Sequence, residues 1–207
     1  MLKLEEEFQE EILKKVSRTF ALTIPQLPDS LSKAVANAYL LCRIADTIED
    51  DTNLTLDEKK YFSNLLIEIL EKKNLNFAEL EQNLKTKLGE TITASEKKLI
   101  ENSESVITIT HSLSLPMQKA MITCVKNMTK GMVKYQGKET LDGLKNQSAT
   151  DDYCYFVAGV VGEMLTEIFT DYGQQWEQSK KNILKEHAVS FGQGLQMTNI
   201  LKDIWAD

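Results

Sequence analysis

AVANAYLLCRIADTIEDD, at residues 34–51, is the stretch of sequence that decides the fold. Its first twelve residues are apolar apart from Asn37 and Arg43. A helix made of such residues has no polar face, and helices of this kind are buried on most sides. The stretch therefore predicts a helix at the centre of the protein, with the rest of the chain packed around it.

Three carboxylates stand at the end of this predicted helix. Asp46, Glu49 and Asp50 are spaced i, i+3 and i+4, which places them on one face with neighbouring Cβ atoms roughly 5–6 Å apart. Like charges this close repel, and at the end of a buried helix they are costly unless a cation neutralises them. Oxygen ligands suit Mg²⁺, which commonly shares one or two carboxylates with a substrate phosphate. The alternative is a helix that ends in solvent at Asp46, and this stretch alone leaves both interpretations open.

A second acidic pair lies at the end of the chain. Residues 191–207, FGQGLQMTNILKDIWAD, have another mostly apolar helical pattern, in which Asp203 and Asp207 are spaced i, i+4. Two buried helices that each deliver carboxylates from one face could form the two walls of one metal–diphosphate site.

Four separated motifs resemble those of the squalene and phytoene synthases. They are SRTF at 17–20, LLCRIADTIED at 40–50, DYCYFVAGVVGE at 152–163 and QMTNILKD at 196–203, in the family's order and across nearly the whole chain. The resemblance implies an all-α fold, the isoprenoid synthase bundle of helices around a central apolar cavity whose mouth carries both acidic clusters. It also implies a single domain over residues 1–207, the N-terminal portion of a bundle truncated at its C-terminus.

The same resemblance assigns residues to the site. The implied Mg²⁺ ligands are Asp46, Glu49, Asp50, Asp203 and Asp207. The implied catalytic residues are Asp46, Asp50, Asp203, Asp207 and Tyr153, the last at the position of a tyrosine implicated in the family's first half-reaction. The implied substrate-binding residues are Ser17, Arg18, Phe20, Arg43, Val157, Gly159, Gln196, Asn199 and Lys202.

Some of these assignments keep a structural alternative. Arg18 and Arg43 are the only arginines beside 22 lysines, and the planar guanidinium suits bidentate phosphate binding. A structural ion pair is the alternative for each. Gly159 interrupts a helix of large residues, and the resemblance favours a kink or hollow beside a prenyl tail over close packing against another helix. Gly192 and Gly194 pose the same choice.

The reaction that the resemblance implies is a Mg²⁺-dependent head-to-head condensation of two farnesyl diphosphates. The product is presqualene diphosphate and then, with NADPH, squalene. The sequences of the motifs most resemble those of bacterial squalene synthases. Phytoene or dehydrosqualene synthesis is the alternative within the enzyme class. A non-catalytic relative that serves as an assembly or lipid-binding module is the alternative outside it. Complete acidic clusters argue against this alternative, and two departures keep it open: Ala206 stands where many relatives have a second acid, and the sequence stops at Asp207 in mid-helix.

Composition narrows the class of protein further. A chain of 207 residues suffices for one sizeable core, and nine Gly with three Pro favour helices. The net charge of −7, without a basic stripe, argues against nucleic acid as a partner. Cys42, Cys124 and Cys154 are widely spaced in apolar surroundings and predict reduced core thiols. With no signal peptide or membrane-spanning run in the sequence, we expect a cytoplasmic monomer and leave peripheral membrane association open.

Apolar periodicity, capping residues and prolines predict where the helices lie. The central helix is expected to begin at its N-cap, Asp29 or Ser30. The other helices are expected to cover residues 4–16, 56–72, 77–88, 94–111, 114 onward, 151–172 and 179 to the end. The 77–88 helix is polar and expected on the outside. The expected caps are, in chain order, Asp29 or Ser30, Thr55 with Glu58, Thr93 with Glu96, and Thr150 or Asp151.

Overall fold

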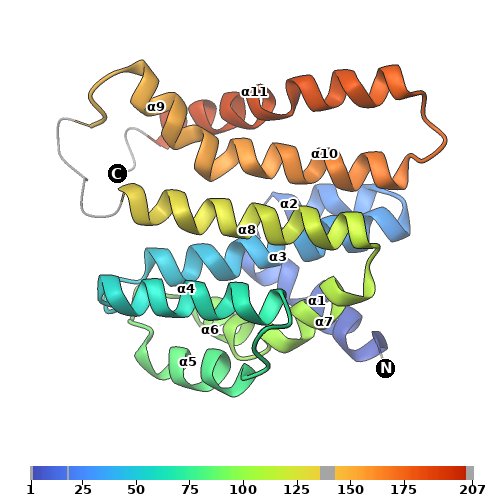
Figure 1. Cartoon of the computed structure of the whole chain (residues 1–207). Helices are drawn as coiled ribbons and strands as arrows, with labels where there is room; N and C mark the ends of the chain where they lie inside the picture. The colour runs from blue at the N-terminus through green and yellow to red at the C-terminus, as the bar shows by residue number, and fades with distance from the viewer. Residues whose placement is uncertain (1, 18, 136–142, 204–207) are drawn as a thin grey trace.

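Helix α3 (Asp29–Asp50) forms the centre of the protein, as its sequence predicts (Figure 1). The structure is a computed structural model that describes residues 2–17, 19–135 and 143–203. Of Asp203, it describes the backbone only. The other elements are α1 (Leu2–Val16), α2 (Phe20–Thr23), η1 (Ile24–Gln26), α4 (Leu56–Leu70), η2 (Glu79–Asn83), α5 (Leu84–Lys87), α6 (Ala94–Ile100), α7 (Ser103–Ser112), α8 (Leu115–Tyr135), α9 (Gln147–Cys154), η3 (Tyr155–Gly159), α10 (Val160–Tyr172) and α11 (Gln178–Asp203).

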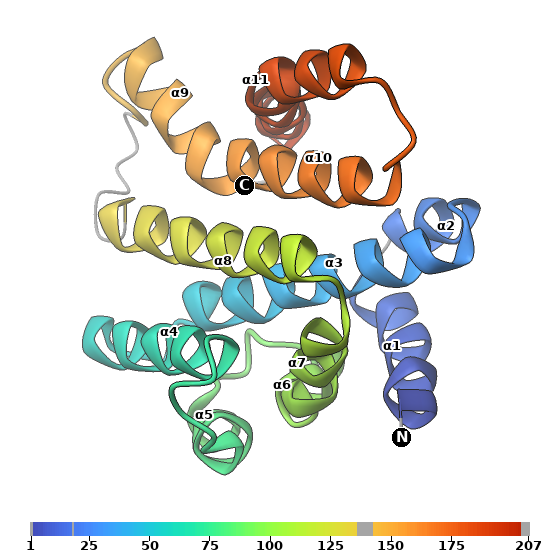
Figure 2. The same cartoon turned by 45° about the vertical axis from the view of Figure 1, so that its right-hand side comes forward.

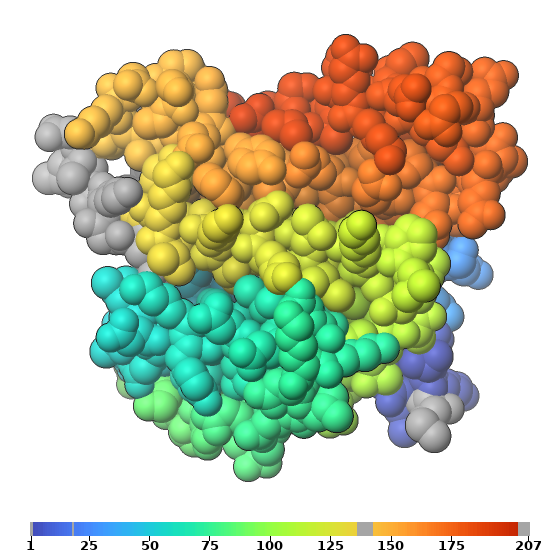
Figure 3. Space-filling model, in the orientation of Figure 1, coloured from blue at the N-terminus to red at the C-terminus, as the bar shows by residue number. Residues whose placement is uncertain are grey.

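Every regular element within the described ranges is a helix, which confirms the all-α prediction. Both views show α8 between α4 on one side and α10 on the other, with α11 outermost beyond α10 (Figures 1 and 2). The space-filling view shows the same order of layers on the surface (Figure 3). None of the helices in these ranges combines the length and the apolarity needed to cross a membrane.

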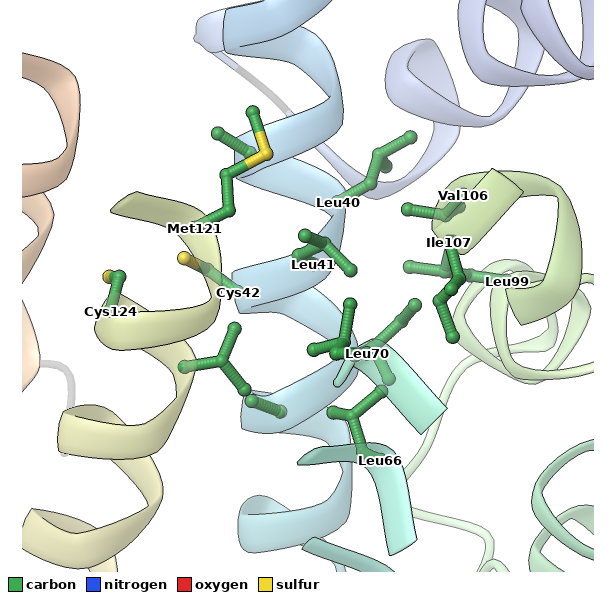
Figure 4. Packing of buried hydrophobic residues seen from close by; sticks show 14 of the residues in the cluster. Leu40, Leu41, Cys42, Leu66, Leu70, Leu99, Val106, Ile107, Met121 and Cys124 are labelled. Carbon is green, nitrogen blue, oxygen red and sulfur yellow. The ribbon is translucent and has the colours of Figure 1, made fainter. Parts of the chain in front are cut away.

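The core surrounds α3 on most sides. Helices α1, α4, α6, α7, α8 and α10 all pack on it. Leu40 and Leu41, which have no exposed surface, face the apolar side chains of α4, α6 and α7, and Cys42 lies toward Cys124 of α8 (Figure 4). All three cysteines are buried and unbridged, as the sequence predicts. The apolar stretch at 34–45 is therefore buried because it has a packing partner on nearly every face.

Both capping boxes are present. The Thr55 hydroxyl accepts a hydrogen bond from the Glu58 backbone N–H, and the Glu58 carboxylate accepts one from the Thr55 N–H. Thr93 and Glu96 form the same reciprocal pair at the start of α6. These caps satisfy backbone N–H groups that have no partner inside the helix. The pattern therefore located the starts of α4 and α6 correctly.

The expected caps at Asp29 or Ser30, and at Thr150 or Asp151, are wrong. The Pro28 carbonyl accepts the first helical bond of α3, from the Ser32 N–H, so Asp29 is already helical and caps nothing. Helix α9 begins earlier than expected because the Asn146 side chain accepts a hydrogen bond of 2.9 Å from the Ala149 N–H. Asn is among the strongest N-cap residues, and this signal outweighed Thr150.

Two predicted helices differ from the observed ones. The predicted 94–111 helix is two helices, because the Asn102 side chain donates to the Lys98 carbonyl (2.8 Å) and competes with the helical ladder. The predicted outer helix at 77–88 is a π turn followed by α5, and Leu80 and Leu84 have no exposed surface. That segment therefore contributes to the core rather than only decorating the outside.

Small residues allow α10 and α11 to pack closely. A Cβ atom at Gly162 would lie 2.1 Å from the Ala188 carbonyl oxygen, and one at Gly192 would lie 2.3 Å from the Ala158 carbonyl oxygen. Backbone atoms block both positions, so only glycine fits. Close helix packing is thus the reason for Gly192, one of the positions that the sequence left open. Gly194 has no neighbour within 4 Å, and its reason is not apparent.

A buried carboxylate fastens the turn that follows α3. Asp51, which has no exposed surface, accepts hydrogen bonds from the N–H groups of Asn53 (2.8 Å), Leu54 (2.9 Å) and Gly89 (2.7 Å). The Gly89 bond joins the end of α3 to a loop 38 positions further along the chain. Asp51 is therefore a structural acid, although it stands beside the acidic cluster in the sequence.

We predict that Asp51→Ala lowers the free energy of unfolding by about 3 kcal/mol, because three backbone N–H groups lose their acceptor. Asp51→Asn keeps one oxygen and should cost less. Urea unfolding followed by circular dichroism measures both, and Asp57→Ala is the control, since 97% of that side chain is exposed. Equal stability of the Asp51→Ala and Asp57→Ala variants would contradict the assignment.

Candidate functional site

A cavity of about 580 Å³ lies at the carboxyl end of α3. Six of the predicted site residues line it together, although they come from three separate motifs of the sequence. These are Asp46, Glu49 and Asp50 of α3, Tyr153 of α9, Val157 of η3 and Gln196 of α11. The remaining lining residues are Gly131, Met132, Tyr135, Gly143 and Leu144.

A π turn shapes the wall opposite the carboxylates. Helices α9 and α10 run into each other through η3, where the chain makes i→i+5 bonds over Tyr155–Gly159. The extra residue of such a turn shifts the helical register between Tyr153 and the packed face of α10. Tyr153 and Val157, four residues apart, both line the cavity, while Gly159 packs against Val189 of α11 and does not line it.

Two carboxyls of this cavity, those of Asp46 and Glu49, are partly buried, whereas Asp50 is exposed. Burial raises the pKa of Asp46 from its ordinary 3.8 to about 7, with repulsion from Asp50 and Glu96 added and the attraction of Arg43 opposing. Burial, a hydrogen bond with Asp50 and repulsion from Asp50 and Asp46 raise the pKa of Glu49 to about 7 as well. Near neutral pH, ionisation of Asp46 and Glu49 is therefore incomplete without a cation.

The donor set fits a hard divalent cation. Asp46, Glu49 and Asp50 offer only oxygen atoms, as Mg²⁺ prefers. Within the described ranges, no three acidic, His or Cys side chains converge closely enough to hold a metal ion by themselves. Mg²⁺ held by these residues would therefore need further ligands, such as water and substrate phosphate.

Tyr153 stands beside the acidic cluster. Burial raises the pKa of its phenol, and the negative charges of Glu49, Asp50 and Asp46 raise it further. The phenol consequently stays protonated at neutral pH and can donate a hydrogen bond into the cavity. Its ring packs edge-to-face on Tyr135, with 5.4 Å between ring centroids and 83° between ring planes.

Arg43 belongs to a separate cluster beside the cavity and is not among the lining residues. Its Nη2 donates to the Tyr39 hydroxyl (3.0 Å), and its Nη1 lies 3.9 Å from the Glu96 carboxylate. Its guanidinium lies 5.6 Å from the centroid of the Tyr39 ring. Its buried Nε has no hydrogen-bond partner among the described residues. The ion pair that the sequence left as the alternative is therefore present, and diphosphate contact by Arg43 stays a prediction.

The other predicted residues lie elsewhere. Ser17 is buried, and its hydroxyl accepts a hydrogen bond of 3.2 Å from the Ala21 N–H at the start of α2. Phe20 is 53% exposed and packs against Tyr39 at 5.5 Å between ring centroids. Asn199 and Lys202 lie on the exposed part of α11. Arg18 and Asp207 fall outside the described residues, as does the side chain of Asp203.

Sequence reasoning missed Tyr135, which lines the cavity beside Tyr153. It also missed Asp152, whose carboxylate accepts a hydrogen bond from the Tyr135 hydroxyl. The available signal was the Lys134–Tyr135 pair at the end of α8, just before the most loop-like segment of the chain. Polar and aromatic residues at the ends of helices frequently line sites built between them.

The fold and the cavity define an all-helical protein whose buried central helix ends in an acidic cluster at the entrance of a partly apolar cavity. The squalene/phytoene synthase family model matches residues 13–207. The chain belongs to the squalene/phytoene synthase family.

Individual relatives agree with this assignment. A squalene synthase from Botryococcus braunii is 32% identical over 198 residues, and one from Solanum lycopersicum is 33% identical over 198 residues. Each match covers 95% of this chain, but only 38% and 43% of the two relatives. A solved structure of TcSQS in complex with the ligand BPH1237 superposes with a TM-score of 0.77 at 26% identity, over 99% of this chain and 55% of that one. The chain thus spans less than half the length of these two relatives, which are prenyltransferases.

We predict that the raised pKa values of Asp46 and Glu49 make stability fall as pH rises. Between the ordinary values of 3.8 and 4.5 and the folded value of about 7, the folded chain binds more protons than the unfolded chain. The free energy of unfolding should therefore decline from pH 5 to pH 7 and then level off, in buffer with EDTA.

Asp46→Asn should reduce this decline, because the amide does not titrate. Urea unfolding at pH 5, 6, 7 and 8 measures the effect, and Asp57→Asn, at an exposed position, should keep the wild-type slope. The same pH slope in wild type and Asp46→Asn would mean that Asp46 titrates normally.

Proposed function

We propose that this chain provides the first acidic wall and part of the cavity of a Mg²⁺-dependent prenyltransferase. The reaction is the head-to-head condensation of two farnesyl diphosphates to presqualene diphosphate and then squalene. One observation carries the proposal: a single cavity collects Asp46, Glu49 and Asp50 together with Tyr153 and Gln196, residues from three distant motifs. The family assignment supports the chemistry, and the relatives named above support squalene as the product.

The carboxylates suit the binding of a metal–diphosphate group. Asp46 and Glu49 hold protons near neutral pH because burial and mutual repulsion disfavour their charges. A cation that replaces those protons removes the repulsion, so binding of the cation is coupled to release of protons. Mg²⁺, when bound there with the substrate diphosphate, would stabilise the charge of the leaving pyrophosphate.

The other walls suit the prenyl part of the substrate. Met132, Leu144 and Val157 present apolar surface to the same cavity that the acids line. Apolar walls exclude water that would quench an allylic cation, and the face of an aromatic ring such as Tyr153 attracts positive charge by about 0.5–2 kcal/mol.

We predict that the chain binds pyrophosphate and farnesyl diphosphate only with Mg²⁺, and that Asp46→Ala weakens this binding by at least about tenfold. Even changes to outer-shell partners of metal sites commonly cost that much. Isothermal titration with and without Mg²⁺ measures the affinity, and Asp57→Ala should bind like wild type. If binding does not depend on Mg²⁺, or if Asp46→Ala leaves it unchanged, the acidic cluster is not the diphosphate site.

Product analysis tests the reaction itself. With farnesyl diphosphate and Mg²⁺, we expect pyrophosphate and presqualene diphosphate, and squalene when NADPH is added, each identified by chromatography. Dehydrosqualene without NADPH, or phytoene from a C20 diphosphate, would assign the chain to the other branch of the family. Intact binding without release of pyrophosphate would favour the non-catalytic alternative.

A further inference from the structure

A polar cluster joins the end of α8 to α9 at the edge of the cavity. The Lys134 Nζ lies 2.5 Å from Oδ2 of Asp152. The Tyr135 hydroxyl donates to the same carboxylate oxygen and also lies 3.3 Å from the Ala149 carbonyl oxygen. We call Lys134, Tyr135 and Asp152 the α8–α9 clamp.

Aromatic contacts connect the clamp to the cavity. The Tyr135 ring packs edge-to-face on Tyr153, with centroids 5.4 Å apart. The Lys134 Nζ lies 5.5 Å from the centroid of the Tyr135 ring and 5.3 Å from that of Phe156. The Phe156 ring occupies the space that the absent side chain of Gly131 leaves on α8. The clamp therefore packs against the Tyr153 ring through Tyr135, which itself lines the cavity with the acids.

The hydrogen bond in the clamp has a defined direction at neutral pH. Hydrogen bonds from Lys134 and Tyr135 lower the pKa of Asp152, so this carboxyl is ionised. Burial and the Asp152 charge raise the pKa of Tyr135 to about 12, so this phenol is protonated. A protonated phenol that donates to a carboxylate is a strong, charge-assisted hydrogen bond, and it holds the Tyr135 ring in one orientation.

We propose that Tyr135 and Asp152 are positioning residues that hold Tyr153 in place beside Glu49 and Asp50. The inference rests on the proposed function, because Tyr153 needs a fixed position only if the cavity carries out chemistry. Tyr153 lies two residues before a π turn, where the helix is distorted, and Tyr135 of α8 supports its ring from outside its own helix. Misplacement of a catalytic group by about 1 Å can cost on the order of a hundredfold in rate.

The first test needs no activity. The chain has six tyrosines, so a spectrum of ring-¹³C-labelled tyrosine is simple, and Tyr153→Phe identifies the Tyr153 signal. We expect Tyr135→Leu, Tyr135→Phe and Asp152→Asn each to shift or broaden that signal. The matched control is Tyr61→Phe, since Tyr61 also donates to a carboxylate, that of Glu79 (3.2 Å), and packs edge-to-face on a ring, that of Phe62 (5.1 Å). An unchanged Tyr153 signal in Tyr135→Leu would overturn the proposal.

The second test measures turnover of farnesyl diphosphate. Tyr135→Phe and Asp152→Asn should lower kcat by about tenfold or more, with KM and the Mg²⁺-dependent affinity for pyrophosphate within about twofold of wild type. Asp152→Glu, which keeps the acceptor, should recover part of kcat, and Tyr61→Phe should behave like wild type. Wild-type kcat in both clamp variants, or equal losses in binding and kcat, would overturn a positioning role.

The two tests separate this inference from the proposed function. If wild type releases no pyrophosphate, the proposed function is wrong. The positioning role, which rests on it, is then wrong as well, whatever the Tyr153 signal shows. If wild type is active while kcat is unchanged in the clamp variants, only the positioning role fails.

Discussion

The burial of α3 is the constraint on which the rest of the structure depends. Because α3 has packing partners on nearly every face, Asp46 and Glu49 at its end are partly buried, and burial disfavours their charged forms. Asp51, by contrast, is fully buried, and three backbone N–H groups satisfy it and tie it to the fold. Within the described residues, no backbone N–H group donates to Asp46 or Glu49, and their charges are instead opposed by one another and by Asp50. Two kinds of acid thus stand within six residues of each other, one that stabilises the fold and one that favours a cation.

Much of the fold could be predicted because the signals were local. The apolar run of α3 and the capping boxes of α4 and α6 act within a few residues, and the structure confirms each. Two errors in the predicted helix boundaries arose where alternative local hydrogen bonds have similar strength. Asn102 bonds back to Lys98 and divides a predicted helix, and Asn146 begins α9 before Thr150 can. Such choices depend on tertiary packing, which a single sequence does not specify.

Only those site residues to which the motifs assign a role could be predicted from the sequence. The convergence of Tyr153, Val157 and Gln196 on the carboxylates follows the resemblance to the family, and the structure brings these residues into one cavity. Tyr135 belongs to no motif, and Asp152 begins the third motif without a role that the motif assigns to it. Their contact depends on how α8 and α9 are placed. The role of Arg43 could not be predicted from the sequence either. Its partner Glu96 lies 53 positions further along the chain, so spacing could not decide between an ion pair and a phosphate contact.

The two walls of the cavity are held in place by different means. The acidic wall belongs to α3 and is fixed by the core. The facing wall is carried by α9, η3 and α11, and α11 is attached mainly where Gly162 and Gly192 let backbones touch, while Phe191 and Leu195 remain 66% and 52% exposed. A contact between backbones depends on the absence of a side chain and tolerates no larger residue. The position of Gln196 opposite the carboxylates therefore depends on two glycines, whereas the position of Asp46 depends on the whole core. Substitutions at these two glycines should consequently disturb the facing wall before they disturb the acids.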